Sequence, residues 1–157
     1  MTSPESFSRS PLSTVSTNAI ASSLFAVQTS GRGFVDLTDE IARFVRDAGA
    51  IEGMVTLFIR HTSASLTIQE NADPTVLADL TTALDRLAPE NAGWSHDTEG
   101  PDDMPAHVKT MLTPTSLHVP VLKGELALGT WQAIYLIEHR ARPNCREILL
   151  QFVGATG

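Results

Sequence analysis

Cysteine, long apolar runs and clusters of basic residues are scarce in this chain of 157 residues. The one cysteine, Cys145, rules out an intramolecular disulfide, and no Asn-x-Ser/Thr glycosylation sequence occurs. Both features fit the reducing cytoplasm, which we expect as the protein's location. No apolar run approaches the ~20 residues that span a bilayer, so we expect no membrane partner.

Positive charge is also in short supply. The formal net charge is −7, and lysine and arginine form no cluster. The long-range field of such a chain repels polyphosphate backbones. We therefore expect no nucleic acid among its partners.

The start of the chain differs in composition from the rest. Residues 1–19 are rich in Ser, Thr and Pro and lack the basic start and apolar stretch of a secretory signal, so they predict a flexible N-terminal extension. No internal repeat or second compositional block follows. We expect residues 20–157 to form one domain, because a chain of this length can bury roughly 70% of its unfolded surface.

Apolar periodicity indicates both strands and helices. Strands are predicted at residues 20–29, 34–35, 54–59, 63–69, 116–122, 130–139 and 146–153. Helices are predicted at residues 37–48, 73–87 and 104–111. Strands and helices interleave without strict βα repeats. The predicted fold class is therefore α+β, a single domain of mainly antiparallel strands with helices packed on it.

Local signals mark the ends of the helices. Thr38 is placed to cap the first helix and Gly49 to end it. Asp73 is placed to cap the second helix, with Pro74 at the first helical position, where a missing N–H costs nothing. The stripe expected to be buried on this second helix comprises Val76, Leu77, Leu80, Leu84 and Leu87.

A polar segment dense in hydroxyl groups runs from Arg60 to Asp73. His61 could act there as a general base, or as an anion contact when protonated. Thr62, Ser63 and Ser65, with neighbouring backbone N–H groups, could cradle a phosphate or sulfate. The alternative is that these hydroxyls hydrogen-bond across an antiparallel ladder. No Ser-His-Asp order or Gly-x-Ser-x-Gly elbow accompanies them, so nucleophilic serine catalysis is not predicted.

Two polar residues follow the predicted strand of that segment. Glu70 and Asn71 lie between the strand and the helix that Asp73 is expected to cap. The sequence indicates no local structural role for either residue. We therefore assign Glu70 and Asn71, with His61, to the catalytic part of a pocket.

His96 and His107 flank a loop that contains four acids. Neutral imidazoles beside carboxylates suit zinc, because the carboxylates can either bind the metal or orient the rings. Magnesium is the alternative metal. For His107 the alternative role is a hydrogen-bonded core histidine. His139 is the third candidate metal ligand, with His61 as its rival.

The predicted strand at residues 130–139 supplies further candidate ligand-binding residues. They are Gln132, Glu138 and Arg140. Strand alternation places Glu138 and His139 on opposite faces, so both can reach one pocket only if the strand ends or bulges there. The alternative for Glu138 and Arg140 is an ion pair between strands or subunits.

Three segments together, residues 60–73, 99–107 and 129–140, closely resemble the YjbQ family of small bacterial and archaeal proteins. The resemblance covers roughly residues 20 to 153. It implies an α+β fold that assembles as a homotrimer, with His96 and His107 in positions that belong to the family's pattern. Members of that family with bound metal are known.

The family is often labelled a secondary thiamine-phosphate synthase. That label implies a metal-dependent cytoplasmic enzyme acting on a small phosphorylated metabolite, which joins a pyrimidine diphosphate to a thiazole phosphate with release of pyrophosphate. The expected partner is thus a small anionic metabolite. The alternative function is a non-enzymatic trimeric module that binds a metal or metabolite.

Overall fold

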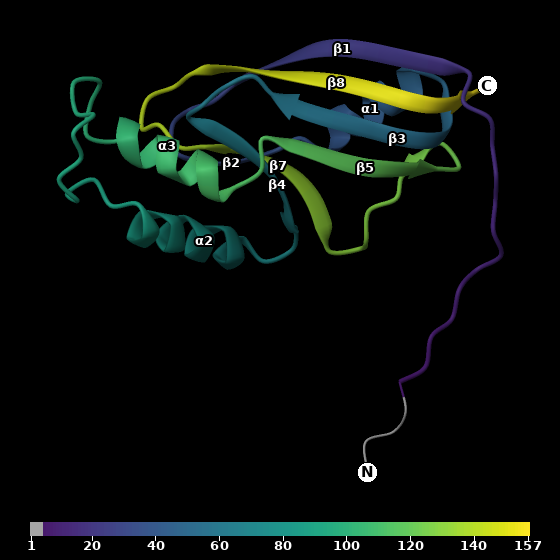
Figure 1. Ribbon diagram of the computed structural model, residues 1–157, viewed down its shortest axis with the longest axis horizontal. Coiled ribbons are helices and arrows are strands. Elements are labelled where there is room, and N and C mark those ends of the chain that lie inside the picture. Colours follow the sequence, from purple (N-terminus) through teal and green to yellow (C-terminus); the bar gives the residue numbers. More distant parts are fainter. Residues whose placement is uncertain (1–4) are drawn as a thin grey trace.

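Two antiparallel β-sheets organise the chain in the computed structural model, which describes residues 5–157 (Figure 1). The larger sheet has the order β1-β8-β3-β5-β6, with strands Ala19–Gln28, Cys145–Thr156, Ala50–Ile59, Ser116–Leu122 and Glu125–Leu126. The smaller sheet has the order β2-β7-β4, with strands Gly33–Asp36, Gln132–Glu138 and Ala64–Glu70. Every strand pair is antiparallel, so the predicted α+β class of mainly antiparallel strands is confirmed.

The N-terminal segment takes no part in either sheet before Ala19. Residues 5–18 form no helix or strand, and Figure 1 shows them leading away from the sheets. Residues 1–4 of the predicted extension lie outside the described residues. The flexibility of the extension stays a prediction.

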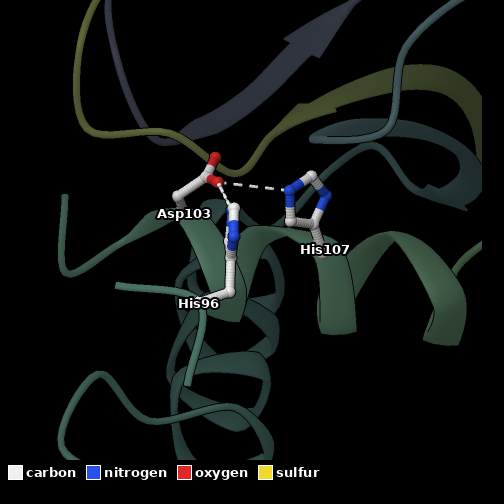
Figure 2. A group of neighbouring side chains, drawn as sticks. All are labelled: His96, Asp103 and His107. Atoms are coloured by element: carbon white, nitrogen blue, oxygen red, sulfur yellow. Dashed lines mark hydrogen bonds and ion pairs between the residues drawn. The ribbon is translucent and has the colours of Figure 1, made fainter. Parts of the chain in front are cut away.

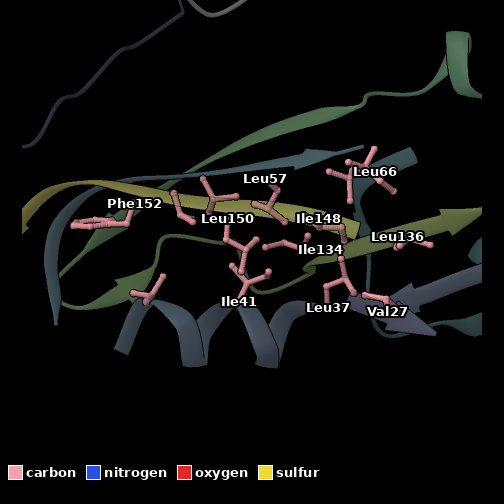
Figure 3. Packing of buried hydrophobic residues seen from close by; sticks show 14 of the residues in the cluster. Val27, Leu37, Ile41, Leu57, Leu66, Ile134, Leu136, Ile148, Leu150 and Phe152 are labelled. Atoms are coloured by element: carbon pink, nitrogen blue, oxygen red, sulfur yellow. The ribbon is translucent and has the colours of Figure 1, made fainter. Parts of the chain in front are cut away.

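The core lies between the two sheets and under helix α1, Thr38–Asp47 (Figure 3). Leu57, Ile148 and Phe152 enter it from the larger sheet, and Leu136 enters it from the smaller one. Ile41 of α1 closes the layer and has no exposed surface. The sheets therefore bury one face each on a shared apolar layer, as half-apolar strands require.

Strand β3 differs from the sequence-based expectation of a strand covered on both faces. Val55, Leu57 and Ile59 are buried, but Met54 and Phe58 are 44% and 47% exposed. Although nearly all residues of this strand are apolar, only one of its faces is buried. Neighbouring strands add to the same exposed surface. We call it the outer apolar face; it comprises Ile20, Leu24, Met54, Phe58, Leu149 and Val153.

The helix ends follow local chemistry, with one correction. Thr38 does not cap α1: its backbone N–H donates to Asp36 Oδ1 at 2.9 Å, and its own Oγ1 accepts from the Ile134 N–H at 2.9 Å. The threonine therefore ties the helix to β7. Gly49, with φ of +64°, follows the C-cap of α1 as expected.

Helices α2, Pro74–Leu87, and α3, Asp103–Leu112, pack together beside β4 at one end of the sheets (Figure 1). Asp73 caps α2 as predicted, because its side chain accepts from the Thr75 N–H at 2.9 Å. The expected stripe on α2 is only partly buried, and Leu87 is 66% exposed. No helix within residues 5–157 is long and apolar enough to cross a membrane.

Candidate metal centre

Two histidines and one aspartate converge where the loop after α2 meets α3 (Figure 2). Asp103 Oδ2 lies 2.7 Å from His96 Nε2 and 3.2 Å from His107 Nε2. One ligand atom from each of the three residues falls within 4.8 Å of the other two. The structure thus brings His96 and His107 together, as the sequence predicted, and adds Asp103, the first residue of α3.

Helix α3 and the loop before it position these side chains. Asp103 and His107 are four residues apart on α3, so they share one face of the helix. His96 approaches from the loop, which is folded on itself by a hydrogen bond from Trp94 Nε1 to the Pro89 carbonyl at 2.9 Å. The cluster is therefore partly preformed.

Asp103 is buried and anchored on its far side. Arg140 Nη1 donates to Asp103 Oδ1, while Arg140 Nε donates to Asp102 at 3.1 Å. Burial alone would raise the pKa of Asp103, but the hydrogen bond with His96 and the charge of Arg140 outweigh it and lower the pKa. The carboxylate is thus held ionised, with Oδ2 directed at the two imidazoles.

The orientation of the His107 ring follows from its contacts. Its Nδ1 lies 2.8 Å from the Thr62 carbonyl oxygen, which can only accept, so Nδ1 carries the proton. The other ring nitrogen, Nε2, therefore faces Asp103 Oδ2 at 3.2 Å. It can donate to the carboxylate when no metal is bound, and once deprotonated its lone pair has the orientation that a metal requires. The hydrogen bond with Asp103 raises the pKa of His96, which favours the protonated ring beside the carboxylate.

His139 lies outside this cluster. Its ring is only 2% exposed, and Nε2 is 2.9 Å from Ser65 Oγ, whose own neighbour is Thr113 Oγ1 at 2.6 Å. Burial first, and then the charge of Lys109, lowers the pKa of His139 to about 4. The ring is therefore neutral at neutral pH and sits in a closed hydroxyl network, not beside His96 and His107.

A second network surrounds Glu138, which is 1% exposed. Arg146 Nε donates to Glu138 Oε2 at 2.6 Å, and the Thr29 hydroxyl donates to the same oxygen at 2.9 Å. Arg146 Nη2 also donates to Ser63 Oγ at 3.0 Å. We call Glu138, Arg146, Thr29 and Ser63 the buried ionic network.

His61 borders the buried ionic network and is fixed by it. The backbone N–H of Glu147 donates to His61 Nε2 at 2.8 Å, and Arg146 Nη1 lies 3.4 Å from Nδ1. Burial, reinforced by the charge of Arg146, lowers the pKa of His61. The Nε2 lone pair is thus already in use, and the catalytic role predicted for His61 remains an untested prediction.

Glu70, Asn71 and Gln132 lie at the opposite end of the small sheet. Ala64 pairs with Glu138 in the β4–β7 ladder, whereas Glu70 pairs with Gln132 six residues along, about 20 Å away at strand spacing. Asn71 Nδ2 donates to the Thr130 carbonyl at 3.1 Å. Glu70, Asn71 and Gln132 therefore form a separate group from the metal cluster.

Residues in this second group have local contacts that the sequence did not reveal. Glu70 Oε2 accepts from the Ala72 and Asp73 N–H groups, at 3.1 and 2.9 Å, across the turn into α2. Gln132 Oε1 accepts from the Gly129 N–H at 2.8 Å. Thr62, by contrast, is exposed and contributes its carbonyl, not its hydroxyl, to the metal cluster.

Sequence reasoning missed Arg146, the residue that neutralises Glu138. Its strand was predicted, but an arginine at a strand start gives no signal of burial, because arginine is usually exposed. The alternation of β8, in which Arg146, Ile148 and Leu150 share the inward face, is the signal that could have found it.

Comparison with known proteins shows which family this chain resembles. Residues 23–155 match the family described as "UPF0047 protein YjbQ-like". A UPF0047 protein of Synechocystis is 46% identical over 132 residues, covering 83% of this chain and 90% of that protein. The UPF0047 protein YjbQ of Escherichia coli O157:H7 is 45% identical over 124 residues, covering 78% of this chain and 90% of that protein.

Solved structures agree on the fold. An uncharacterised YjbQ/UPF0047 protein of Clostridium acetobutylicum superposes with a TM-score of 0.77 at 35% identity, over 82% of this chain and 98% of that one. A protein of unknown function from Sulfolobus solfataricus gives a TM-score of 0.78 at 23% identity, over 87% of this chain and all of that one. That second likeness supports the fold alone.

These relatives correct the expected function. The sequence-based expectation was a metal-dependent cytoplasmic enzyme acting on a small phosphorylated metabolite, with thiamine-phosphate synthesis as the candidate activity. The relatives are named as uncharacterised UPF0047 proteins or as proteins of unknown function, and no thiamine-phosphate synthase activity is indicated. The expected function is therefore wrong.

Proposed function

Because this chain belongs to the YjbQ-like UPF0047 family, whose names state no activity, we propose from the site itself that the protein binds one divalent metal ion. The ligands are His96 Nε2, Asp103 Oδ2 and His107 Nε2. The observation that carries the proposal is the convergence of these three atoms, which lie within 4.8 Å of one another.

Zinc is the metal that these donors favour. Two imidazole nitrogens and one carboxylate oxygen are ordinary zinc ligands, at about 2.0–2.2 Å from the ion. Tetrahedral coordination at those lengths separates the donor atoms by about 3.3 Å. The oxygen–nitrogen distances of 2.7 and 3.2 Å are slightly shorter, so an ion bound there would move both rings outward from Asp103.

Three protein ligands leave room for a fourth. Glu99 Oε2 lies 3.1 Å from His96 Nε2, so its carboxylate is a candidate to complete the set. If Glu99 stays in solvent, the open position takes water or one donor atom of a small anionic metabolite, which we propose as the partner. His139 belongs to the Ser65 network and has no part in this proposal.

Zinc titration of untagged protein by calorimetry tests the metal site. We expect one ion per chain, and weakening by at least about 100-fold in His107→Ala, because losing a ligand costs more than losing one of its supports. The matched control is His118→Ala, which removes an exposed imidazole on β5 that hydrogen-bonds to Thr56. Equal zinc affinity in wild type and His107→Ala would refute the site.

Affinity should also depend on pH. Zinc must displace the proton of His96, whose pKa is raised above 6.5. The affinity is therefore expected to fall as the pH drops through the neutral range. The same calorimetric titration at several pH values measures this dependence.

We further propose that the protein assembles as a homotrimer in the cytoplasm. The outer apolar face supports self-association, since solvated sheet faces normally carry polar side chains. The number three rests on the family resemblance alone, and the reducing compartment rests on the single, unpaired Cys145. Light scattering should give about three times the monomer mass, and Phe58→Glu should lower it. An unchanged mass in Phe58→Glu would remove this face as the interface.

A further inference from the structure

A cavity of about 420 Å³ lies between α1 and the β5–β6 hairpin, lined by none of the residues of the metal centre. Its volume falls in the range of small-molecule sites, about 300–1,000 Å³. One wall is a single face of α1, formed by Thr38, Ala42, Val45 and Arg46. The hairpin forms the other wall.

Two cations line the cavity without a carboxylate partner. Within residues 5–157, no carboxylate oxygen lies within 4.0 Å of the charged groups of Arg46 or Lys123. Arg43, one turn earlier on α1, pairs with Glu40 at 3.0 Å. Arg46 and Lys123 thus differ from Arg43 in bringing unneutralised positive charge to the lining of the cavity.

Lys123 is held in place by an unusual backbone. Lys123 and Gly124 form the two-residue turn between β5 and β6, with φ of +53° and +81°. Such turns favour asparagine, aspartate or glycine at the first position, and a lysine there is uncommon. The Gly124 N–H donates to the Ile51 carbonyl at 2.8 Å, which anchors the turn on β3. The backbone that carries the Lys123 side chain is therefore fixed beside the cavity.

The rest of the lining is apolar, with one acid. Val45 is buried, and Leu126 and Leu128 are partly buried and pack against the core. The Thr38 hydroxyl accepts from Ile134, so its proton is free to donate. Glu125 also lines the cavity and opposes a second negative charge on any ligand.

We propose that this cavity binds a small amphipathic monocarboxylate. The carboxylate lies between Arg46 and Lys123, and the aliphatic chain covers Val45, Leu126 and Leu128. The ligand is expected to carry one negative charge only, because a dicarboxylate would place its second carboxylate near the Glu125 side chain. The proposal is independent of the metal centre.

Titration of the ¹⁵N-labelled full chain with octanoate, followed by NMR, tests the proposal. The amide signals of Ala42, Arg46, Gly124 and Leu126 are expected to shift together. Octanol, octylammonium and the dicarboxylate suberate should each bind at least about tenfold more weakly, because hydrogen bonds to charged groups carry that much affinity. Equal binding of octanol, no binding of octanoate, or shifts confined to the outer apolar face would overturn it.

Two variants and a matched control isolate the cations. The double variant Arg46→Gln, Lys123→Asn should weaken octanoate binding by at least about tenfold, and asparagine tolerates the positive φ at that position. Arg43→Gln removes one charge from the same helix but not from the cavity, so it should change affinity by less than about twofold. Equal weakening in Arg43→Gln would reduce the effect to net charge and refute the site.

Discussion

The buried ionic network and the metal centre include residues only two positions apart, Glu138 and Arg140. The two clusters differ in which carboxylate oxygens remain without a cation. In the buried ionic network, both oxygens of Glu138 accept hydrogen bonds from Arg146 and others, and Glu138 is 1% exposed. Two residues later, Arg140 holds only the far oxygen of Asp103, which leaves the near one for two half-exposed imidazoles. A site that binds ligands is distinguished by lone pairs that the fold leaves available, not by its residue types.

The largest expected effect breaks the buried ionic network. Arg146→Met leaves the Glu138 carboxylate buried without its counter-charge, which should lower the free energy of unfolding by about 3–5 kcal/mol. Urea denaturation measures it. Adding Glu138→Gln to the same chain removes the stranded charge, so the double variant should be more stable than Arg146→Met alone. A single variant as stable as wild type would show that Glu138 is neutral in the native protein.

The features that the sequence predicted correctly are those determined by residues close together in the chain. Asp73 and Pro74 mark the start of α2, and Asp73 does cap it. His96 and His107 meet because α3 starts within the acidic loop that separates them in sequence. Each of these features depends on contacts within a short stretch of chain, which side-chain type and spacing describe well.

Features that depend on strand pairing could not be read from the sequence. Glu70 and Gln132 lie at one end of the β4–β7 ladder and Glu138 at the other, so one predicted pocket became two groups. The partition into two sheets also decides that β3 exposes Met54 and Phe58. Side-chain alternation fixes which residues share a face, but register and sheet order decide what that face meets.

A smaller effect is expected from pH, through His139. Its pKa is about 4 in the folded protein against 6.5 for the ordinary side chain. Between these values the unfolded chain binds a proton that the native protein does not, so stability is lost as the pH falls from 6.5 toward 4. At about 1.4 kcal/mol per pH unit, the loss approaches about 3 kcal/mol.

Urea denaturation at pH 7 and pH 4.5 measures this loss. The control is His139→Gln, which keeps a polar group near Ser65 but does not titrate. Carboxylates affect both proteins alike, so the difference between their pH dependences belongs to the imidazole. Parallel pH dependences would mean that His139 is protonated in the native state or exposed in solution.

The smallest effect on stability is expected in the metal centre, where His96→Ala should lower the urea midpoint of the metal-free protein only slightly, because a half-exposed ion pair contributes little to stability. The His96 side chain is 44% exposed, and its removal leaves the hydrogen bonds of Asp103 with Arg140 and His107 in place. Added zinc should nevertheless separate the two proteins. A ligand that binds only the native state raises the melting temperature, so zinc should raise that of wild type and not that of His96→Ala. If metal-free His96→Ala instead unfolds as readily as Arg146→Met, both clusters are needed for stability. The lone pairs of Asp103 would then stabilise the fold and would not be available to a ligand.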